Sequence, residues 1–159
     1  MRDHSYALQV RWIGNTGEGT KNYRSYARDY LIQAEGKAAV EGSSDPAFRG
    51  DALRYNPEEL LVASLSSCHM LWYLHLCAVN GVVVVDYEDA AAGTMRETNS
   101  GSGSFAKVEL NPKVTIASSS DPAKARALHE EAHKNCFIAN SVNFSVLITP
   151  CIVKLPAKN

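Results

Sequence analysis

The sequence carries little excess charge of either sign: 16 lysines and arginines nearly balance 17 aspartates and glutamates, for a formal net charge of −1. It has no basic block, and it therefore lacks the electrostatic footprint of a nucleic-acid-binding protein. It also has no internal repeat and no interdomain linker. A chain of 159 residues with 45% hydrophobic content is expected to form a single domain over residues 1–159.

The sequence shows no targeting or membrane segment of the usual kind. Residues 1–5 lack the apolar region of a signal peptide, and serines and histidines interrupt the longest apolar stretch, residues 60–79. We therefore expect a cytoplasmic protein with no membrane partner and no nucleic-acid partner. In that compartment, four cysteines indicate catalysis or metal binding rather than a static disulfide framework.

Alternating apolar and polar residues predict strands in hairpins on both sides of the longest apolar stretch. Turn residues 15–19 and the Gly/Ser loop 99–103 each join two of these strands. Hairpins combined with two segregated helices are typical of the α+β class with antiparallel sheets. The strands are expected over residues 5–13, 22–34, 37–41, 82–97, 104–118 and 143–153.

Two helices are predicted from their end signals. Asn56, followed by proline, suits an N-cap, Glu59 is placed for a capping box, and Gly81 suits the helix end. The second helix runs from the N-cap Asp121 to about Lys134.

The first predicted helix is apolar on most of its circumference, so it requires burial on nearly all sides. A single domain of this size rarely surrounds such a helix. Dimerisation around the helix is the simplest way to bury it.

Cys68 lies in the middle of this helix, about 11 residues or ~17 Å from its start. The helix dipole fades within the first turn, and an ordinary thiol is mostly protonated near neutral pH. If Cys68 reacts, a cation from another segment must favour its thiolate; otherwise the residue is a small hydrophobe in the core. The candidate cations before the helix are Arg24, Arg28, Arg49 and Arg54.

Cys136 follows the second helix in a polar setting, which suits a resolving cysteine for Cys68 better than a buried loop cysteine. Cys77 is nine residues after Cys68 and points about 180° away on the helix, so we expect it in the core. Cys151 in the final strand is also expected to be packed. Glu58 and Glu59 are first-turn carboxylates favoured by the helix dipole, or one of them orients the arginine.

Four histidines allow a different interpretation. His69 and His75 are expected as core histidines of the first helix. His129, His133 and Cys136 are spaced i, i+4, i+7, and with Cys68 or His69 they could form a zinc site. However, the chain contains no C-x-x-C or H-E-x-x-H pattern, and a polar helix face also explains this spacing.

These motifs resemble the osmotically induced protein C / organic hydroperoxide resistance (OsmC/Ohr) family. The first family motif, Asn-Pro-Glu-(Glu/Gln)-Leu followed by a helical cysteine, matches residues 56–60 and Cys68. The second, a cysteine at a helix end preceded by His or Lys and Asn, matches residues 133–136. The cysteine separation and the order of the elements agree over nearly the whole chain. After Cys68, the segment His69–Trp72 departs from the Cys-Phe common in the best-known branches.

The resemblance implies an intertwined homodimer with both long helices at its centre and active sites at the subunit interface. It implies a thiol peroxidase in which Cys68 attacks the peroxide and Cys136 resolves the product as a Cys68–Cys136 disulfide. Glu58 would pair with a catalytic arginine, for which Arg49 in Phe48-Arg49-Gly50-Asp51 fits best and Arg24 and Arg28 follow.

The resemblance predicts reduction of organic hydroperoxides, with hydrogen peroxide as a second candidate substrate and a dithiol of lipoyl or other type as reductant. No cofactor or metal is expected. The alternative is a non-catalytic dimer of the same fold that binds zinc or a small ligand.

Overall fold

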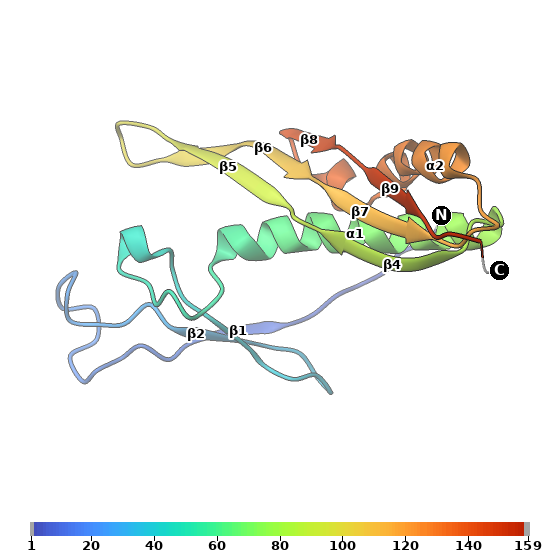
Figure 1. Ribbon diagram of the computed structural model, residues 1–159. Coiled ribbons are helices and arrows are strands. Elements are labelled where there is room, and N and C mark those ends of the chain that lie inside the picture. The colour runs from blue at the N-terminus through green and yellow to red at the C-terminus, as the bar shows by residue number, and fades with distance from the viewer. Residues whose placement is uncertain (1, 158–159) are drawn as a thin grey trace. The chain divides into compact units, whose positions relative to one another are not determined.

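The computed structural model describes residues 2–157 (Figure 1). The chain divides into two compact units, with the boundary between Leu60 and Leu61. The α+β class is confirmed: three three-stranded sheets accompany two main helices. The expectation of one domain over residues 1–159 stays a prediction.

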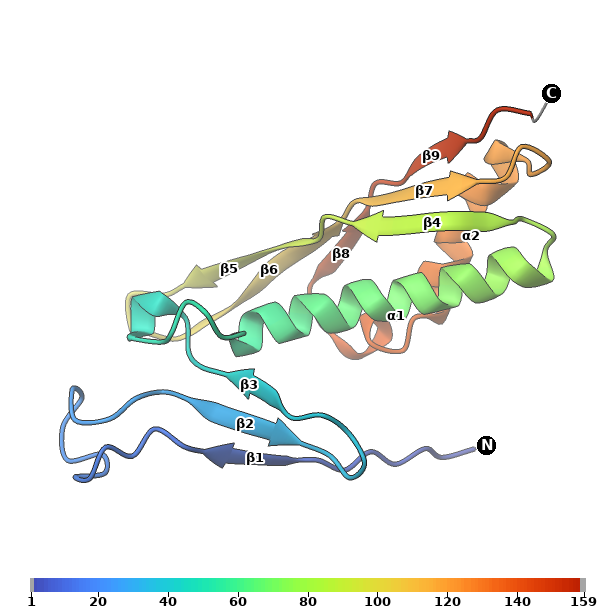
Figure 2. The ribbon, with the colours of Figure 1, turned by 60° about the horizontal axis from the view of Figure 1, so that its bottom comes forward.

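The first unit contains one antiparallel sheet in the order β1-β2-β3 (Figure 2). The predicted strand 22–34 was too long, because residues 15–25 form a loop held by its own side chains. Only the later residues of the predicted ranges 5–13 and 22–34 pair, and the third strand ends one residue beyond the predicted 37–41. The strands are β1 (Gln9–Trp12), β2 (Tyr30–Gln33) and β3 (Val40–Gly42).

The main helix α1 (Pro57–Val79) confirms the predicted end signals. The Asn56 side chain accepts from the Glu59 N–H at 2.8 Å, and the Asn56 N–H donates to Glu59 Oε2 at 3.0 Å, as a capping box requires. At the other end Gly81 adopts φ 74°, which lets the Val82 N–H reach the Cys77 carbonyl at 2.9 Å.

The two long strands predicted after α1 are each broken near the middle. Asp89 Oδ1 accepts from the Asn111 N–H at 2.7 Å, and the Asn111 side chain donates to the Ala90 carbonyl at 3.0 Å, so these side chains fix the break. The outer halves pair as a hairpin that continues the course of the inner halves (Figures 1 and 2). The four strands are β4 (Val84–Asp89), β5 (Ala92–Glu97), β6 (Gly103–Leu110) and β7 (Pro112–Ile116).

Helix α2 (Pro122–Asn135) begins at Asp121, whose side chain accepts from the Ala123 N–H at 2.9 Å, as predicted. A short 3-10 turn, η2 (Ala139–Ser141), follows. The single final strand predicted over 143–153 is interrupted at Pro150 into β8 (Ser145–Ile148) and β9 (Cys151–Lys154). These add parallel pairs, β8 to β6 and β9 to β7, to otherwise antiparallel sheets.

The core of the second unit lies between the helices and the sheets. One cluster joins α1, α2, β7 and Val82: Tyr73 and Cys77 pack with Val114, Ile116 and Ala125. The Tyr73 hydroxyl donates to the Ala125 carbonyl at 3.0 Å and so ties α1 to α2. A second cluster centres on Leu65, Val108 and Leu110.

Helix α1 buries only one stripe of its surface within the chain, with Leu65, His69, Tyr73 and Cys77 at intervals of four residues. Leu71 and Val79, on other sides of the helix, are 63% and 64% exposed. By length and composition α1 could cross a membrane, since its best 18-residue window has a mean hydropathy of 1.4, but a core helix passes the same test. The burial that its composition demands is therefore incomplete in one copy of the chain.

Candidate active site

The thiols of Cys68 and Cys136 lie in hydrogen-bonding contact within the second unit. Cys68 is half-buried on α1, and Cys136 is buried at the C-cap of α2. Burial, and then a hydrogen bond with Cys68, raises the pKa of Cys136 to about 11. The proton is thus held on Cys136, whose thiol faces the more accessible Cys68 sulfur.

The backbone after α2 fixes the Cys136 sulfur. The Cys136 N–H donates to the His133 carbonyl at 3.3 Å, and its Sγ accepts from the Ala139 N–H at 3.4 Å. These bonds close the helix end around the side chain, which explains why a cysteine in polar sequence is only 1% exposed.

Two aromatic rings accompany the thiols. Trp72 lies one turn after Cys68, and Phe137 directly follows Cys136. Their ring centroids are 5.7 Å apart in an edge-to-face contact. Trp72 also lines an apolar pocket of about 290 Å³ with Leu71 and His75. Sequence reasoning missed Phe137, although its place beside Cys136 was a usable signal.

The other two cysteines differ from each other. Cys77 is 1% exposed in the core, as predicted. Cys151 is exposed on β9, so the prediction that it packs inside is wrong. Its neighbour Ile152 packs against the core, so Cys151 points to the opposite, exposed face of the sheet.

Arg49 lies in a tightly built loop of the first unit. It caps the 3-10 turn η1 (Pro46–Phe48) and has φ 65° and ψ 28°, the left-handed region that few non-glycine residues adopt. Asp45 holds the turn by accepting from the Ala47 N–H with its side chain at 2.7 Å and from the Gly50 N–H with its carbonyl at 3.1 Å. Strain of this kind is often retained at functional positions.

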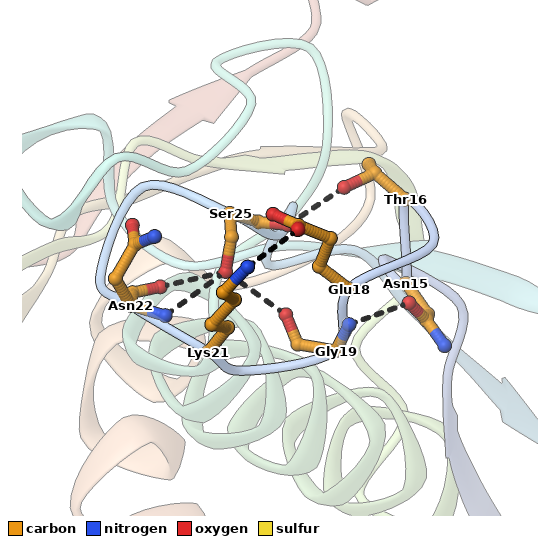
Figure 3. A network of polar contacts seen from close by, with 7 residues as sticks. All are labelled: Asn15, Thr16, Glu18, Gly19, Lys21, Asn22 and Ser25. Carbon is orange, nitrogen blue, oxygen red and sulfur yellow. Dashed lines mark hydrogen bonds and ion pairs between the residues drawn. The ribbon is translucent and has the colours of Figure 1, made fainter.

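The loop of residues 15–25 carries Arg24 and is closed by its own polar side chains (Figure 3). Asn15 Oδ1 accepts from the N–H groups of Gly17 and Gly19 at 2.9 and 3.0 Å. Ser25 Oγ donates to the Gly19 carbonyl at 3.0 Å. Only the backbone N–H of Arg24 enters this network, by donating to Asn22 Oδ1 at 2.8 Å.

Arg28 is occupied by structural contacts. Its guanidinium donates to the carbonyls of Tyr26 and Tyr23, both at 2.6 Å, and lies 4.1 and 4.4 Å from the centroids of the same two rings. Arg54 is likewise engaged, with Asp29, Glu41 and Asp51 within 4 Å. Arg49, an exposed side chain 6.0 Å from the Tyr23 ring, makes no ion pair among residues 2–157.

The two carboxylates in the first turn of α1 have different roles. Glu59 completes the capping box, whereas Glu58 makes no side-chain hydrogen bond among the described residues. Burial, and then the charge of Glu58, raises the pKa of Tyr30 in the same unit. The structure therefore leaves Glu58 as the carboxylate available to an arginine.

Two predicted histidine environments were wrong. His69 is buried as expected, but His75 is exposed on the opposite side of α1. His129 does not lie on a polar helix face: it is 2% exposed, and its Nδ1 lies 2.9 Å from His69 Nε2. Its ring also stacks on Tyr73, with centroids 3.8 Å apart. Among residues 2–157, no group of three or more His, Cys, Asp or Glu side chains is arranged to hold a metal ion.

The comparisons with known proteins agree with this geometry. The model of the OsmC-like protein family matches residues 50–150. An OsmC-like protein of unknown function from Vibrio cholerae O1 biovar eltor is 33% identical, with 94% of this chain and 99% of that chain covered and a TM-score of 0.81. The uncharacterized protein YmaD of Bacillus subtilis is 24% identical over 92% of this chain and 91% of its own length.

An organic hydroperoxide resistance protein OsmC from Legionella pneumophila shares the fold at 16% identity, with a TM-score of 0.66 over 95% of this chain and 99% of that chain. The fold is that of a class of small soluble proteins. With the family model covering well over half of the sequence, the chain belongs to the OsmC-like protein family.

Proposed function

We propose that the protein is a thiol-dependent peroxidase that reduces organic hydroperoxides. The observation that carries this proposal is the contact between a half-buried Cys68 and a buried, protonated Cys136. Such a pair suits a reacting and a resolving thiol, because the accessible sulfur meets the peroxide and the protected sulfur waits beside it. The fold likeness to a protein named for organic hydroperoxide resistance supports the same reaction.

The proposed reaction has three steps. The Cys68 thiolate attacks the O–O bond of the hydroperoxide, which gives Cys68 sulfenic acid and, after protonation of the alkoxide, an alcohol. The Cys136 sulfur then attacks the sulfenic acid, so that a Cys68–Cys136 disulfide forms and water leaves with the Cys136 proton. An external dithiol reduces this disulfide and becomes a disulfide itself.

Arg49 and Glu58 complete the proposed site. The Arg49 guanidinium would hold the Cys68 thiolate through a charge-assisted hydrogen bond, and Glu58 would fix the guanidinium plane. The engagement of Arg28 and Arg54 in other contacts favours Arg49 among the candidates. Homodimerisation is part of the same proposal, because α1 exposes apolar side chains in one copy of the chain. A cytoplasmic location is also part of the proposal.

The apolar surroundings of the thiols favour an organic substrate. Trp72 and Phe137 contact each other beside the two cysteines, and Leu71 extends the apolar surface. An alkyl group gains from contact with these side chains, whereas hydrogen peroxide has no alkyl group to bury.

The test is an assay of tert-butyl hydroperoxide and hydrogen peroxide reduction with several dithiols, for the wild type and three cysteine variants. Cys68→Ser should lose activity, because a hydroxyl does not attack the peroxide bond. Cys136→Ser should consume one equivalent of peroxide without turnover, and mass spectrometry should find the added oxygen on Cys68. Cys151→Ser is the control, because Cys151 lies exposed on β9, and it should keep full activity.

Two results would contradict the proposal. One is residual activity above about a tenth of wild type in Cys68→Ser, a loss of transition-state stabilisation of less than about 1.4 kcal/mol. The other is the absence of a Cys68–Cys136 disulfide in the wild type after mild peroxide treatment. A metal analysis of protein purified without added zinc addresses the alternative: one zinc per chain with unreactive thiols would favour a binding protein.

A further inference from the structure

A second pocket, of about 410 Å³, lies beside α2 in the second unit. Neither Cys68 nor Cys136 is among its described lining residues. One stripe of α2 forms its polar side through residues spaced i, i+3, i+4 and i+7. The segment from β8 to Pro150 forms its apolar side. The lining residues are Arg126, His129, Glu130 and His133 on α2, and Val146, Leu147, Ile148 and Pro150 opposite.

His129 lines this pocket and carries a buried ring nitrogen without a hydrogen-bond partner in the described chain. The side chain is 2% exposed, its Nδ1 is paired with His69 Nε2 at 2.9 Å, and its Nε2 has no partner within the described chain. The two ring nitrogens point in diverging directions, so Nε2 faces away from His69. Buried polar atoms are normally hydrogen-bonded, so an unpartnered ring nitrogen in a residue that lines a pocket indicates a missing partner. The buried Nδ1 of His133 is a second such atom.

The His69 contact sets which proton His129 can offer. Burial, followed by the charges of His69 and Arg126, lowers the pKa of His129 to about 3, so the ring is neutral near neutral pH. If His69 Nε2–H donates to His129 Nδ1, the proton of His129 lies on Nε2. His129 then acts as a hydrogen-bond donor to an acceptor in the pocket.

Arg126 gives the pocket a positive charge. Its Nη1 donates to the Pro150 carbonyl at 2.9 Å, which fixes the guanidinium and leaves its other N–H groups free. It makes no ion pair with a carboxylate anywhere in the described part of the chain. Glu130 on the same wall adds a negative charge that opposes a dianion. The pocket therefore suits a single negative charge.

We propose that this pocket binds a small organic monocarboxylate with a short hydrocarbon chain. Arg126 and the Nε2–H of His129 bind the carboxylate, and Val146, Ile148 and Pro150 contact the hydrocarbon. The volume of about 410 Å³ lies within the range of small-molecule sites, which typically combine apolar walls with a few fixed polar groups. Neither thiol is among the described lining residues, and the proposal does not depend on the peroxidase proposal.

The test is calorimetric titration of the full chain with hexanoate, and with 1-hexanol as the uncharged ligand of equal length. Hexanoate should bind with a dissociation constant of about 1 mM or tighter, and hexanol at least about tenfold more weakly. Arg126→Gln should weaken hexanoate binding about tenfold. Lys134→Gln removes the same charge from an exposed position of α2 outside the pocket, and it should change binding by less than about twofold.

A second measurement does not depend on a pocket variant. Long-range ¹H–¹⁵N spectra of the histidine rings should show the His129 proton on Nε2 when hexanoate is bound. Cys68→Ser protein should bind hexanoate as the wild type does, so a failed peroxidase assay leaves this result unaffected. The proposal is overturned if hexanoate does not bind at about 10 mM, if hexanol binds equally well, or if the two charge variants behave alike.

Discussion

At the scale of single residues, sequence motifs predict which residues belong to the proposed site, but only the packing of the fold shows which of them are in contact. Cys68 and Cys136 stand out in the sequence because one interrupts an apolar helix and the other ends a polar one. Their contact could not be derived from spacing, since it depends on how α2 returns to α1. The structure also reduces the number of candidate arginines. It shows that Arg28 donates to two backbone carbonyls, which the sequence alone cannot show.

Arg49→Ala should slow both peroxide reduction and alkylation of Cys68 at neutral pH by more than about tenfold, or about 1.4 kcal/mol. The reason is that Cys68 lies in the middle of α1, beyond the reach of the helix dipole, so a side-chain cation must favour its thiolate. Arg49→Lys should recover only part of the rate, because an ammonium lacks the planar pair of donors. The measurement is the pH dependence of Cys68 alkylation.

Arg24→Ala is the matched control, since Arg24 is also an exposed arginine of the first unit. A loss in Arg24→Ala with none in Arg49→Ala would move the role to the loop of residues 15–25. Unchanged alkylation in both variants would remove these two arginines from the mechanism. Arg28→Ala is less informative, because it also removes contacts that hold Tyr23 and Tyr26.

At the scale of elements, the helix ends were predictable and the strand lengths were not. Helix ends depend on local signals such as Asn56, Asp121 and Gly81, and the structure confirms all three. Strand lengths depend on pairing partners distant in sequence. Asp89 and Asn111, 22 residues apart, jointly break two long predicted strands, and the hydrogen bonds between these two segments cannot be read from either segment alone.

The contact between α1 and α2 predicts a specific loss of stability in acid. Burial lowers the pKa of His69 to about 4 and of His129 to about 3. Below about pH 6.5 the unfolded chain therefore binds protons that the folded pair does not bind. The free energy of unfolding should fall as the pH drops from about 6.5 to 4, by at most about 1.4 kcal/mol per pH unit for each histidine.

Urea unfolding between pH 7 and pH 4.5 measures this loss. His69→Gln/His129→Gln should give a shallower decline, whereas His75→Gln, at an exposed position of α1, should keep the wild-type slope. Equal slopes in all three proteins would show that the histidine pair does not control stability in this range. If the double variant is unfolded at pH 7, ring ¹⁵N titration of the wild type still reports whether both histidines stay neutral at pH 5.

At the scale of the whole molecule, the surface of α1 points to a second copy of the chain. Its buried stripe uses one side of the helix, and Leu71 and Val79 remain mostly exposed on the others. Exposed apolar surface on a helix of this hydropathy is typical of an interface. Composition predicted this need for a partner, because a helix apolar on most of its circumference has to be covered on most of it.

Leu71→Glu should therefore convert a dimer into a monomer, because a carboxylate buried against apolar side chains without a partner is strongly unfavourable. Analytical ultracentrifugation should give about 35 kDa for the wild type, twice the chain mass of 17.3 kDa, and the monomer mass for the variant. Leu53→Glu is the control, since Leu53 is 94% exposed in a loop rather than on α1. A monomeric wild type, or a dimer that survives Leu71→Glu, would show that this face of α1 does not join two chains.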